Sequence, residues 1–267
     1  MTRDVYFVSD GTGITAETLG NTLLTQFSGE FVRHRIPFVS DASSARDVVA
    51  QIAAATLETH TRPIVFSTAL LPEVRDILLT ADALVVDLFE KNLAVLEAEL
   101  GQRAIRHTGK AHGMADLDRY RHRISAVEFA IEHDDGQSLR ALALADVILI
   151  APSRCGKTPT TMYLALNHGV KSANYPLLDE ELVGERIPES LAPFREKLFG
   201  LTSNPNRLHQ VREERRPGSP YASLAQCRFE LAAAERIYDK FQIPYVDSAN
   251  RSIEEIAAVM MRELRLS

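Results

Sequence analysis

Hydrophobic positions in the first part of the chain follow two alternating spacings. Short continuous runs rich in valine, isoleucine and phenylalanine predict buried strands, and between them hydrophobic residues recur about every three to four positions, which predicts amphipathic helices. The expected strands are 4–10, 32–40, 63–70 and 83–89, and the expected helices are 15–27, 41–60, one beginning at Pro72, and 91–101. Thr15 is expected to cap the first helix and Gly101 to end the last. This alternation predicts parallel strands joined by helical crossovers.

The same alternation resumes after an interruption. Residues 102–117 are polar and aperiodic, and a helix over 117–133 is expected to end at a turn supplied by Gly136. Further strands are expected at 145–153, 171–178, 197–203 and 243–248, with helices at 158–169, 221–242 and 252–264, the last capped by Ser248 or Asn250. The predicted fold class is α/β, divided into an N-terminal parallel-sheet α/β domain over 1–104, a linker and connecting helix over 105–140, and a second α/β domain over 141–267.

Composition narrows the range of partners. The chain has 267 residues, 45% of them hydrophobic and 25% charged, with a net charge of −6, so it has no bulk attraction for nucleic acid or an anionic membrane. Phosphate recognition must therefore come from local groups. There is no signal-peptide pattern and no apolar run long enough for a membrane span. The only cysteines, Cys155 and Cys227, form neither a disulfide framework nor a CxxC zinc motif, and the expected location is the cytoplasm.

The strongest chemical motif follows the strand 145–153. The stretch 151–158 fits the phosphate-loop pattern Gly-x-x-x-x-Gly-Lys-Ser/Thr except at its first position, and we call it the phosphate loop. Amides around Gly156 would bind a phosphate, Lys157 would reach the terminal phosphate, and Thr158 would bind Mg²⁺. The predicted nucleotide-binding residues are Ala151, Pro152, Ser153, Arg154, Cys155, Gly156, Lys157 and Thr158. The alternative is an ordinary strand-to-helix turn with a solvated lysine.

A run of arginines follows the strand 197–203. The basic segment 204–220 contains Arg207, Arg212, Arg215 and Arg216 and ends in a Pro-Gly break. In kinases of the nucleoside monophosphate type, an arginine-bearing lid precedes a helix, a final strand and a closing helix. The order here is the same, so the segment is interpreted as a lid that supplies positive charge to a phosphoryl group in transfer. With the phosphate loop, this order predicts that the domain over 141–267 is a P-loop kinase-like α/β domain. A solvated helix face, partly neutralised by Glu213 and Glu214, is the alternative.

Several longer motifs resemble one family. They are "SDGTGITAE" (9–17), "HDDG" (133–136), "SRCGKTPT" (153–160), "ANYPL" (173–177), "KLFGLT" (197–202) and "REERR…SPYASLAQCR" (212–228). Together they resemble the bacterial phosphoenolpyruvate synthase regulatory proteins, relatives of the pyruvate, phosphate dikinase regulatory proteins. The resemblance covers nearly the whole chain. It departs from the family at Ala151, where the family usually has glycine.

The resemblance implies a bifunctional enzyme. Such proteins phosphorylate a threonine of their target with ADP as donor, and remove that phosphate by phosphorolysis, in which inorganic phosphate attacks and pyrophosphate leaves. It implies ADP, phosphate and Mg²⁺ as ligands, and phosphoenolpyruvate synthase as the protein substrate. The phosphate loop is expected to hold the ADP β-phosphate and, in the reverse direction, inorganic phosphate, so that one site serves both reactions. The sequence leaves self-association into a homo-oligomer open.

Catalytic groups are expected at two further places. His133, Asp134 and Asp135 form a turn shortly before the strand 145–153, and an aspartate there would accept the threonine proton. The equally weighted alternative is a helix C-terminal turn, with His133 favourable to the helix dipole. Lys157, Arg215 and Arg216 would stabilise charge on the transferring group.

Three other features are interpreted more simply. Ser9, Asp10 and Thr12, with Gly11 and Gly13, are expected to shape a pocket at a strand end rather than a dinucleotide site. His107 and His112 are expected to be solvated rather than metal ligands, because no third ligand converges with them. Cys155 is expected to fill space rather than react.

Two rival functions remain at this point. One is a small-molecule kinase of the nucleoside monophosphate type, and the other is a non-catalytic module that senses a nucleotide and binds a partner protein. The first would transfer phosphate to a small acceptor, and the second would bind ADP without transfer.

Overall fold

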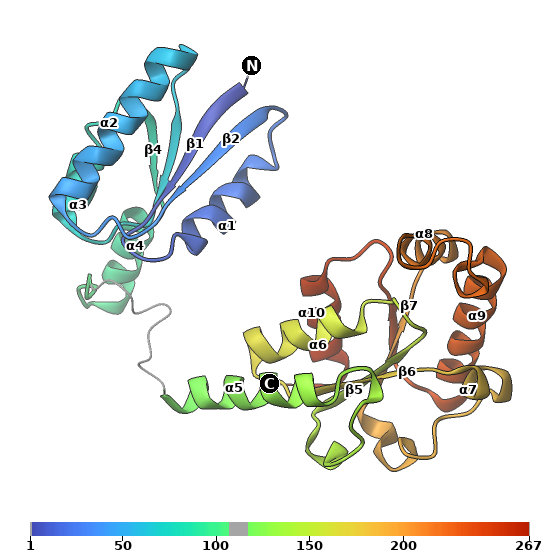
Figure 1. Cartoon of the computed structure of the whole chain (residues 1–267). Coiled ribbons are helices and arrows are strands. Elements are labelled where there is room, and N and C mark those ends of the chain that lie inside the picture. Colours follow the sequence, from blue (N-terminus) through green and yellow to red (C-terminus); the bar gives the residue numbers. More distant parts are fainter. Residues whose placement is uncertain (1, 107–116, 267) are drawn as a thin grey trace. The chain divides into compact units, whose positions relative to one another are not determined.

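The computed structural model describes residues 2–106 and 117–266. The chain forms two compact units, Met1–Ala115 and Asp116–Ser267, each with its own four-stranded parallel sheet (Figure 1). The prediction of two α/β domains with parallel sheets is therefore confirmed. Among the described residues, no helix combines the length and the apolar character that crossing a bilayer requires.

The sheet of the first unit has the strand order β2-β1-β3-β4. Its elements alternate along the chain as β1 (Thr2–Val8), α1 (Ile14–Leu24), β2 (Glu30–Ile36), α2 (Ala42–Thr59), β3 (Ile64–Ser67), α3 (Pro72–Leu78), β4 (Leu84–Asp87) and α4 (Glu90–Leu100). Alternate residues of β1 enter different cores: Val5 and Phe7 pack with α1, and Tyr6 and Val8 pack with α2 and α3. Strand residues point alternately to the two faces, and both faces of this sheet carry helices (Figure 1).

The start of α1 and its packing on the sheet were not predicted from the sequence. The residue before the helix is Gly13, in the left-handed conformation at φ 79°, and no side chain caps the helix, so the prediction that Thr15 is the cap was wrong. A Cβ atom at Gly20 would lie 2.5 Å from the Phe7 ring, so this glycine lets α1 pack closely on the sheet.

The second unit contains the sheet β6-β5-β7-β8. Its strands are β5 (Val147–Ala151), β6 (Ser172–Pro176), β7 (Leu198–Thr202) and β8 (Tyr245–Asp247). Its helices are α5 (Leu117–Glu132), α6 (Lys157–Tyr163), α7 (Asp179–Gly184), α8 (Pro205–Arg215), α9 (Leu224–Phe241) and α10 (Ile253–Glu263), with a π turn over Leu164–His168 and short 3₁₀ turns at Asp134–Gly136, Leu142–Leu144, Ala192–Lys197 and Pro220–Ala222. The helix expected between the domains, α5, belongs to this unit and packs on α6 and β6.

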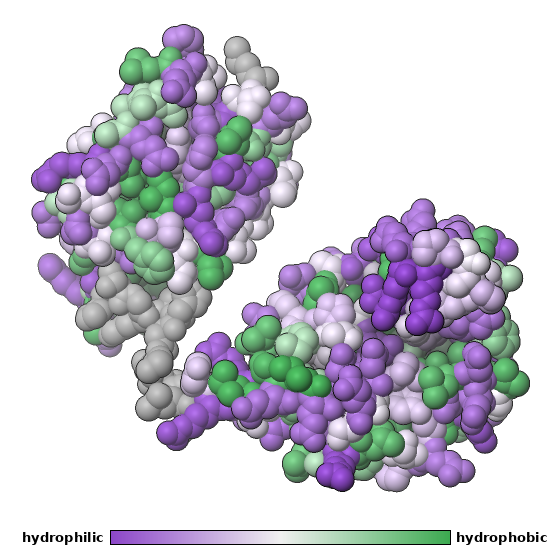
Figure 2. Space-filling view, in the orientation of Figure 1, coloured by the Kyte–Doolittle hydropathy of each residue, from purple (hydrophilic) through white to green (hydrophobic). Residues whose placement is uncertain are grey.

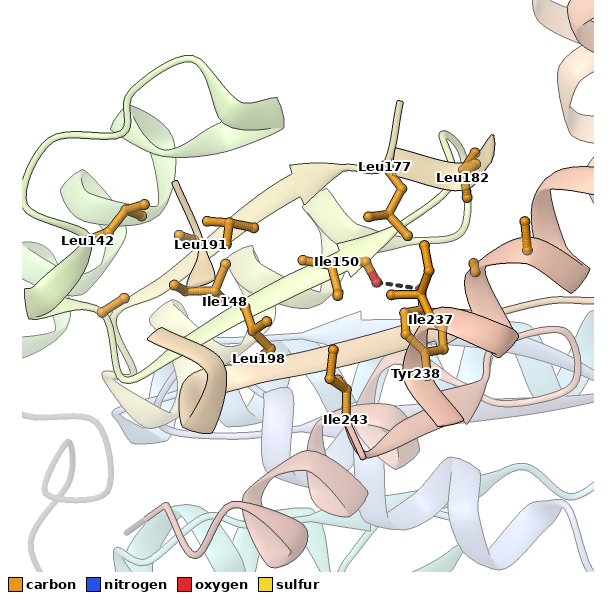
Figure 3. Close-up of a cluster of buried hydrophobic side chains, with 14 of the residues drawn as sticks. Leu142, Ile148, Ile150, Leu177, Leu182, Leu191, Leu198, Ile237, Tyr238 and Ile243 are labelled. Carbon is orange, nitrogen blue, oxygen red and sulfur yellow. Dashed lines mark hydrogen bonds between the residues drawn. The ribbon is translucent and has the colours of Figure 1, made fainter. Parts of the chain in front are cut away.

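Strand β5 is buried along its whole length, as its continuous apolar run predicts. Ile148 and Ile150 pack against Ile237 and Tyr238 of α9 in the core drawn in Figure 3. The Tyr238 hydroxyl lies 2.9 Å from the carbonyl oxygen of Ile150 and 3.1 Å from that of Leu201, which joins α9 to two strands. This core fixes the end of β5, where the phosphate loop begins.

Three local expectations in the second unit need correction. Helix α10 is capped by Ser252, whose side chain accepts a hydrogen bond from the amide of Glu255, and not by Ser248 or Asn250. Helix α7 has no counterpart in the predicted elements because its sequence, DEELVG, is short and half of it is charged, so it shows no helical hydrophobic period. Most of the basic segment 204–220, to which the sequence pattern assigned neither a helix nor a strand, is the regular helix α8.

Candidate functional site

The phosphate loop runs from the end of β5 to the start of α6. Ala151 ends the strand and is buried, and Lys157 begins the helix. Gly156, immediately before the helix, has φ 92°, a value that favours glycine although a Cβ atom there would meet nothing. Arg154 has φ 73°, which is strained for a residue with a side chain. The loop therefore has the strand–loop–helix context that its sequence motif requires.

Side chains from distant parts of the unit fix the loop. The carbonyl oxygen of Ser153 accepts hydrogen bonds from Arg212, at 3.3 Å from Nε and 3.0 Å from Nη2. The Tyr221 hydroxyl donates to Ser153 Oγ at 3.0 Å, and Ser248 Oγ donates to the carbonyl oxygen of Cys155 at 3.1 Å. Pro152 and Cys155 are themselves buried. The loop is therefore anchored on its protein side.

Arg212 is a structural residue. Its side chain is fully buried and forms a two-point ion pair with Glu230 of α9, with contacts of 2.9 and 2.6 Å. Its guanidinium also lies 4.2 Å from the centre of the Tyr221 ring. The expectation that Arg212 supplies charge as part of a lid is not met, because its donors are used by Glu230, Ser153 and Tyr221.

Lys157 lies buried behind the loop with only 4% of its surface exposed. Its Nζ donates long hydrogen bonds of 3.4 and 3.3 Å to the carbonyl oxygens of Ala151 and Pro152, and lies 3.9 Å from Asp135 Oδ1. Burial lowers the pKa of this lysine, against the opposing effect of Cys155, Asp135 and Asp134. Because these contacts are long, the ammonium group can form a closer one with a phosphate oxygen.

The acidic turn Asp134–Gly136 lies directly against the start of α6. Asp134 Oδ1 accepts two hydrogen bonds, at 2.8 Å from Thr158 Oγ1 and at 2.5 Å from Asn174 Nδ2. Asp135 has φ 49°, and its amide donates to Asn174 Oδ1 at 2.9 Å. The fold thus brings the acidic turn and the Lys-Thr pair together, although they are more than twenty residues apart in the chain.

Asn174 is a site residue that sequence reasoning did not single out. It lies in β6, is 2% exposed, and uses both ends of its amide on the acidic turn. Its backbone amide also donates to the carbonyl oxygen of His133 at 3.1 Å. The available signal was an asparagine within the predicted strand 171–178, because an amide that a strand buries must have hydrogen-bond partners.

His133 holds the turn from the other side. Its ring is 1% exposed, with Nδ1 lying 2.8 Å from the carbonyl oxygen of Phe129 and Nε2 lying 2.6 Å from that of Arg140. It also stacks on the Phe129 ring, with centroids 3.9 Å apart. Both ring nitrogens are thus engaged by the backbone, and the ring does not line a cavity described here.

A pocket of about 260 Å³ opens over the loop. Its lining combines the carboxylate of Asp135, the cation of Lys157 and the hydroxyl of Thr158 with a second cation, Arg215 of α8. Arg216, the next residue, follows the last residue of α8, is exposed and does not line this pocket. Figure 2 shows strongly hydrophilic side chains around α8. Of the predicted site residues, Ser153, Arg154, Gly156, Lys157, Thr158, Asp135 and Arg215 line the pocket.

Burial decides the state of the loop cysteine. Cys155 is 2% exposed, and burial raises the pKa of its thiol to about 12, against the opposing effects of Lys157 and Arg212. A thiol with so high a pKa holds little thiolate at neutral pH, and the thiolate is the reactive form. This agrees with the expectation that Cys155 fills space.

The glycine-bearing turn of the first unit is bonded to the segment that follows β3. Ser9 Oγ accepts hydrogen bonds from Thr68 Oγ1 at 2.9 Å and from the amide of Gly11 at 3.1 Å, and Asp10 accepts one from the amide of Leu70. His107 and His112 lie outside the described residues. Among the residues that the structure does describe, no cluster of three or more His, Cys, Asp or Glu side chains could hold a metal ion.

The fold and the site define the class as an α/β protein whose second unit carries a strand–loop–helix phosphate loop facing an acidic turn. The model of the family described as Kinase/pyrophosphorylase matches residues 5–261, and the chain belongs to this family.

Three relatives illustrate the similarity. A protein of Aromatoleum aromaticum is 51% identical over 267 residues, covering 99% of this chain and 96% of the relative. A protein of Legionella pneumophila (strain Corby) is 47% identical over 262 residues, covering 98% and 97%, and one of Xylella fastidiosa (strain 9a5c) is 48% identical over 265 residues, covering 99% and 97%. Each carries the name "Putative phosphoenolpyruvate synthase regulatory protein".

Proposed function

We propose that this protein is an ADP-dependent serine/threonine kinase and a phosphate-dependent phosphorylase that inactivates and reactivates phosphoenolpyruvate synthase at a threonine. Family membership supports the phosphotransferase class, and the names of the relatives support the target. The observation that carries the proposal is the bond between Thr158 of the phosphate loop and Asp134 of the acidic turn. It joins the proposed phosphate-binding element to a turn with two carboxylates, which can supply a base for the hydroxyl and a contact for Mg²⁺.

The phosphate loop binds the diphosphate of ADP in this proposal. Amides around Gly156 and the start of α6 attract the phosphate oxygens, and the Lys157 ammonium moves from its long carbonyl contacts to the β-phosphate. Ala151 in place of the first glycine is compatible with this role, because it is the buried last residue of β5 and does not line the pocket.

The residues present fit Mg²⁺, which prefers hard oxygen ligands and binds few protein groups besides phosphate oxygens. Thr158 and Asp134 would hold it, directly or through water, and Asp135 offers a further carboxylate to that side of the pocket. When bound, the ion would neutralise charge on the diphosphate.

Asp135 is the proposed base. Its carboxylate is 59% exposed and lines the pocket, so a threonine hydroxyl of another protein can reach it. Asp134 Oδ1 already accepts two hydrogen bonds and is held toward Thr158, which suits positioning better than proton transfer. His133, with both ring nitrogens engaged by carbonyl oxygens, positions the turn.

In the kinase direction, Asp135 accepts the proton of the target threonine while the threonine oxygen forms a bond to the β-phosphorus of ADP. The bond between that phosphorus and the bridging oxygen breaks, and AMP leaves with the electron pair. Arg215 steadies the negative charge of the transferring group from α8. Arg216, exposed at the end of α8, is better placed for the partner protein than for the phosphoryl group.

Phosphorolysis uses the same protein groups, the phosphate loop and Asp135. An oxygen of inorganic phosphate attacks the phosphorus of phosphothreonine, the threonine oxygen leaves and takes a proton from Asp135, and pyrophosphate forms. The transferring phosphorus occupies the β-phosphate position in both directions. The attacking phosphate therefore takes the place of the α-phosphate of AMP, which refines the expectation that it occupies the β-phosphate position.

The test is incubation of the pure protein with ADP, Mg²⁺ and phosphoenolpyruvate synthase, followed by detection of phosphothreonine on the synthase. Addition of phosphate in place of ADP should then release pyrophosphate. Transfer to a small acceptor without the synthase would instead indicate the small-molecule kinase, and tight ADP binding without transfer would indicate the nucleotide-sensing module.

A further inference from the structure

A second cavity adjoins the phosphate loop and plays no part in the chemistry above. It has a volume of about 170 Å³ and lies between the loop, α8 and the start of α10. Three residues, Arg154, Gly156 and Val211, line both this cavity and the pocket over Lys157. The two spaces therefore meet at the loop. Each is smaller than the roughly 300 Å³ at which ligand pockets of drug-sized molecules begin, and together they exceed it.

The linings of the two spaces differ in chemistry. The pocket over Lys157 contains Asp135, whereas the lining of the second cavity includes no acidic residue. Instead it has an apolar wall formed by Leu208, Ile253 and Ile256, and three arginines. Arg154 is shared with the pocket over Lys157, whereas Arg207 of α8 and Arg251 just before α10 line only this cavity. An apolar wall flanked by guanidinium groups suits a flat aromatic ring, because guanidinium groups stack on aromatic faces.

Both guanidinium groups are available. Arg207 and Arg251 are exposed, and within the described part of the chain neither side chain forms an ion pair or a hydrogen bond. Two hydroxyls of the lining are already used: Thr160 Oγ1 donates to the carbonyl oxygen of Gly156, and Ser248 Oγ to that of Cys155. Ser203 adds a further hydroxyl to the lining, within reach of a ligand.

We infer that the second cavity binds the nucleoside end of ADP, so that the diphosphate crosses Gly156 to reach Lys157. The base packs on the apolar wall beside Arg207 and Arg251. This inference rests on the proposed function and assigns the part of the donor that does not react. Inorganic phosphate and pyrophosphate have no nucleoside, so the cavity contributes to the kinase direction and stays without a role in phosphorolysis.

The test compares two ligands that differ only in what the cavity would bind. Calorimetry with Mg²⁺ measures the Kd of ADP and of pyrophosphate for the wild-type protein, Arg207→Ala and Arg251→Ala. Loss of one stacking cation from a partly exposed site should weaken ADP binding by about fivefold to tenfold. Pyrophosphate binding should stay within about twofold, because its only contacts are at the phosphate loop. Arg262→Ala, on the exposed face of α10 where Arg262 pairs with Glu263, is the matched control and should change neither Kd.

The outcomes separate the inference from the proposed function. Equal weakening of ADP and pyrophosphate in the two variants, or no change for either ligand, would overturn the nucleoside assignment even if the wild-type protein performs both reactions. If the two variants bound ADP more weakly but pyrophosphate normally, and the wild-type protein transferred no phosphate to the synthase, the nucleoside assignment would be supported and the proposed function refuted. In active protein, the two variants should raise the KM for ADP and leave the KM for phosphate unchanged.

Discussion

The hydroxyl of Thr158 donates a 2.8 Å hydrogen bond to Asp134 Oδ1, and so joins the first turn of α6 to the acidic turn that follows α5. Replacement of Thr158 by valine keeps the shape but removes the donor. We expect loss of kinase activity by about a hundredfold or more, since the proposed Mg²⁺ contact is lost with it, and a decrease of about 1 kcal/mol in the free energy of unfolding. Thr158→Ser retains the hydroxyl and should keep most of the kinase activity and most of the stability. Steady-state kinetics and urea unfolding measure the two effects, and equal activity of the two variants would contradict the prediction.

The two aspartates of the acidic turn should respond differently to the same change. Asp135→Asn is expected to lower kcat by about 10² to 10⁴, the range for loss of a general base, with little change in ADP affinity. Asp134→Asn keeps an oxygen that can still accept from Thr158 and Asn174, so its smaller effect should appear in Mg²⁺ dependence. Single-turnover rates over a Mg²⁺ titration distinguish the roles. If Asp134→Asn lowered kcat more than Asp135→Asn does, Asp134 would be the base and Asp135 the positioning residue.

Lys157 should be more important for activity than for stability. Burial lowers its pKa, so between that lowered value and 10.5 the unfolded chain binds more protons than the folded protein, and the free energy of unfolding rises with pH in this window. Lys157→Met replaces the buried amine with an apolar side chain of similar length and is expected to abolish both reactions. It should also raise the free energy of unfolding by roughly 1 kcal/mol at pH values below the lowered pKa, where the buried lysine carries its charge. Urea unfolding at several pH values should show that the variant lacks this part of the pH slope. Retained phosphorolysis in the variant would refute a single site for both reactions.

The buried pair Arg212 and Glu230 should control the stability of the loop region. Arg212→Ala leaves Glu230 without its partner and Ser153 without its anchor, and we expect a loss of about 3 to 5 kcal/mol. Arg216→Ala, at the exposed residue that follows the last residue of α8, is the control and should change stability by less than about 0.5 kcal/mol. Thermal and urea unfolding measure both. If the two variants were equally stable, the ion pair would not anchor the loop.

Both cysteines should be unreactive in the folded protein. Burial raises the pKa of the Cys155 thiol to about 12 and also raises that of Cys227, so neither forms much thiolate at pH 8. Iodoacetamide is expected to label the native protein very slowly and to label both cysteines in denaturant. Mass spectrometry counts the adducts. Rapid labelling of Cys155 in native protein would show that the loop opens readily.

Local pattern was sufficient for the elements and for the phosphate loop. The run 145–153 predicted the buried strand β5 because a strand that is buried on both faces has apolar residues at consecutive positions. The Gly-Lys-Thr triplet follows this run directly, so the phosphate loop could be recognised from the same short stretch of sequence. Helix caps were less well predicted. Thr15 was chosen over Gly13, and Ser248 or Asn250 over Ser252, because several residues near a helix start can cap it and only the backbone path selects one.

The sequence by itself determined two α/β units and the position of a phosphate loop, because the spacing of apolar residues and a contiguous motif are both properties of neighbouring positions. Only the tertiary structure decided which polar groups serve the site. It turned Arg215 to the pocket and Arg216 to the surface, buried Arg212 against a glutamate eighteen positions away, and placed Asn174 of β6 on Asp134, forty positions before it. The physical reason is that such contacts depend on how helices and strands pack, and packing joins residues whose separation along the chain carries no signal.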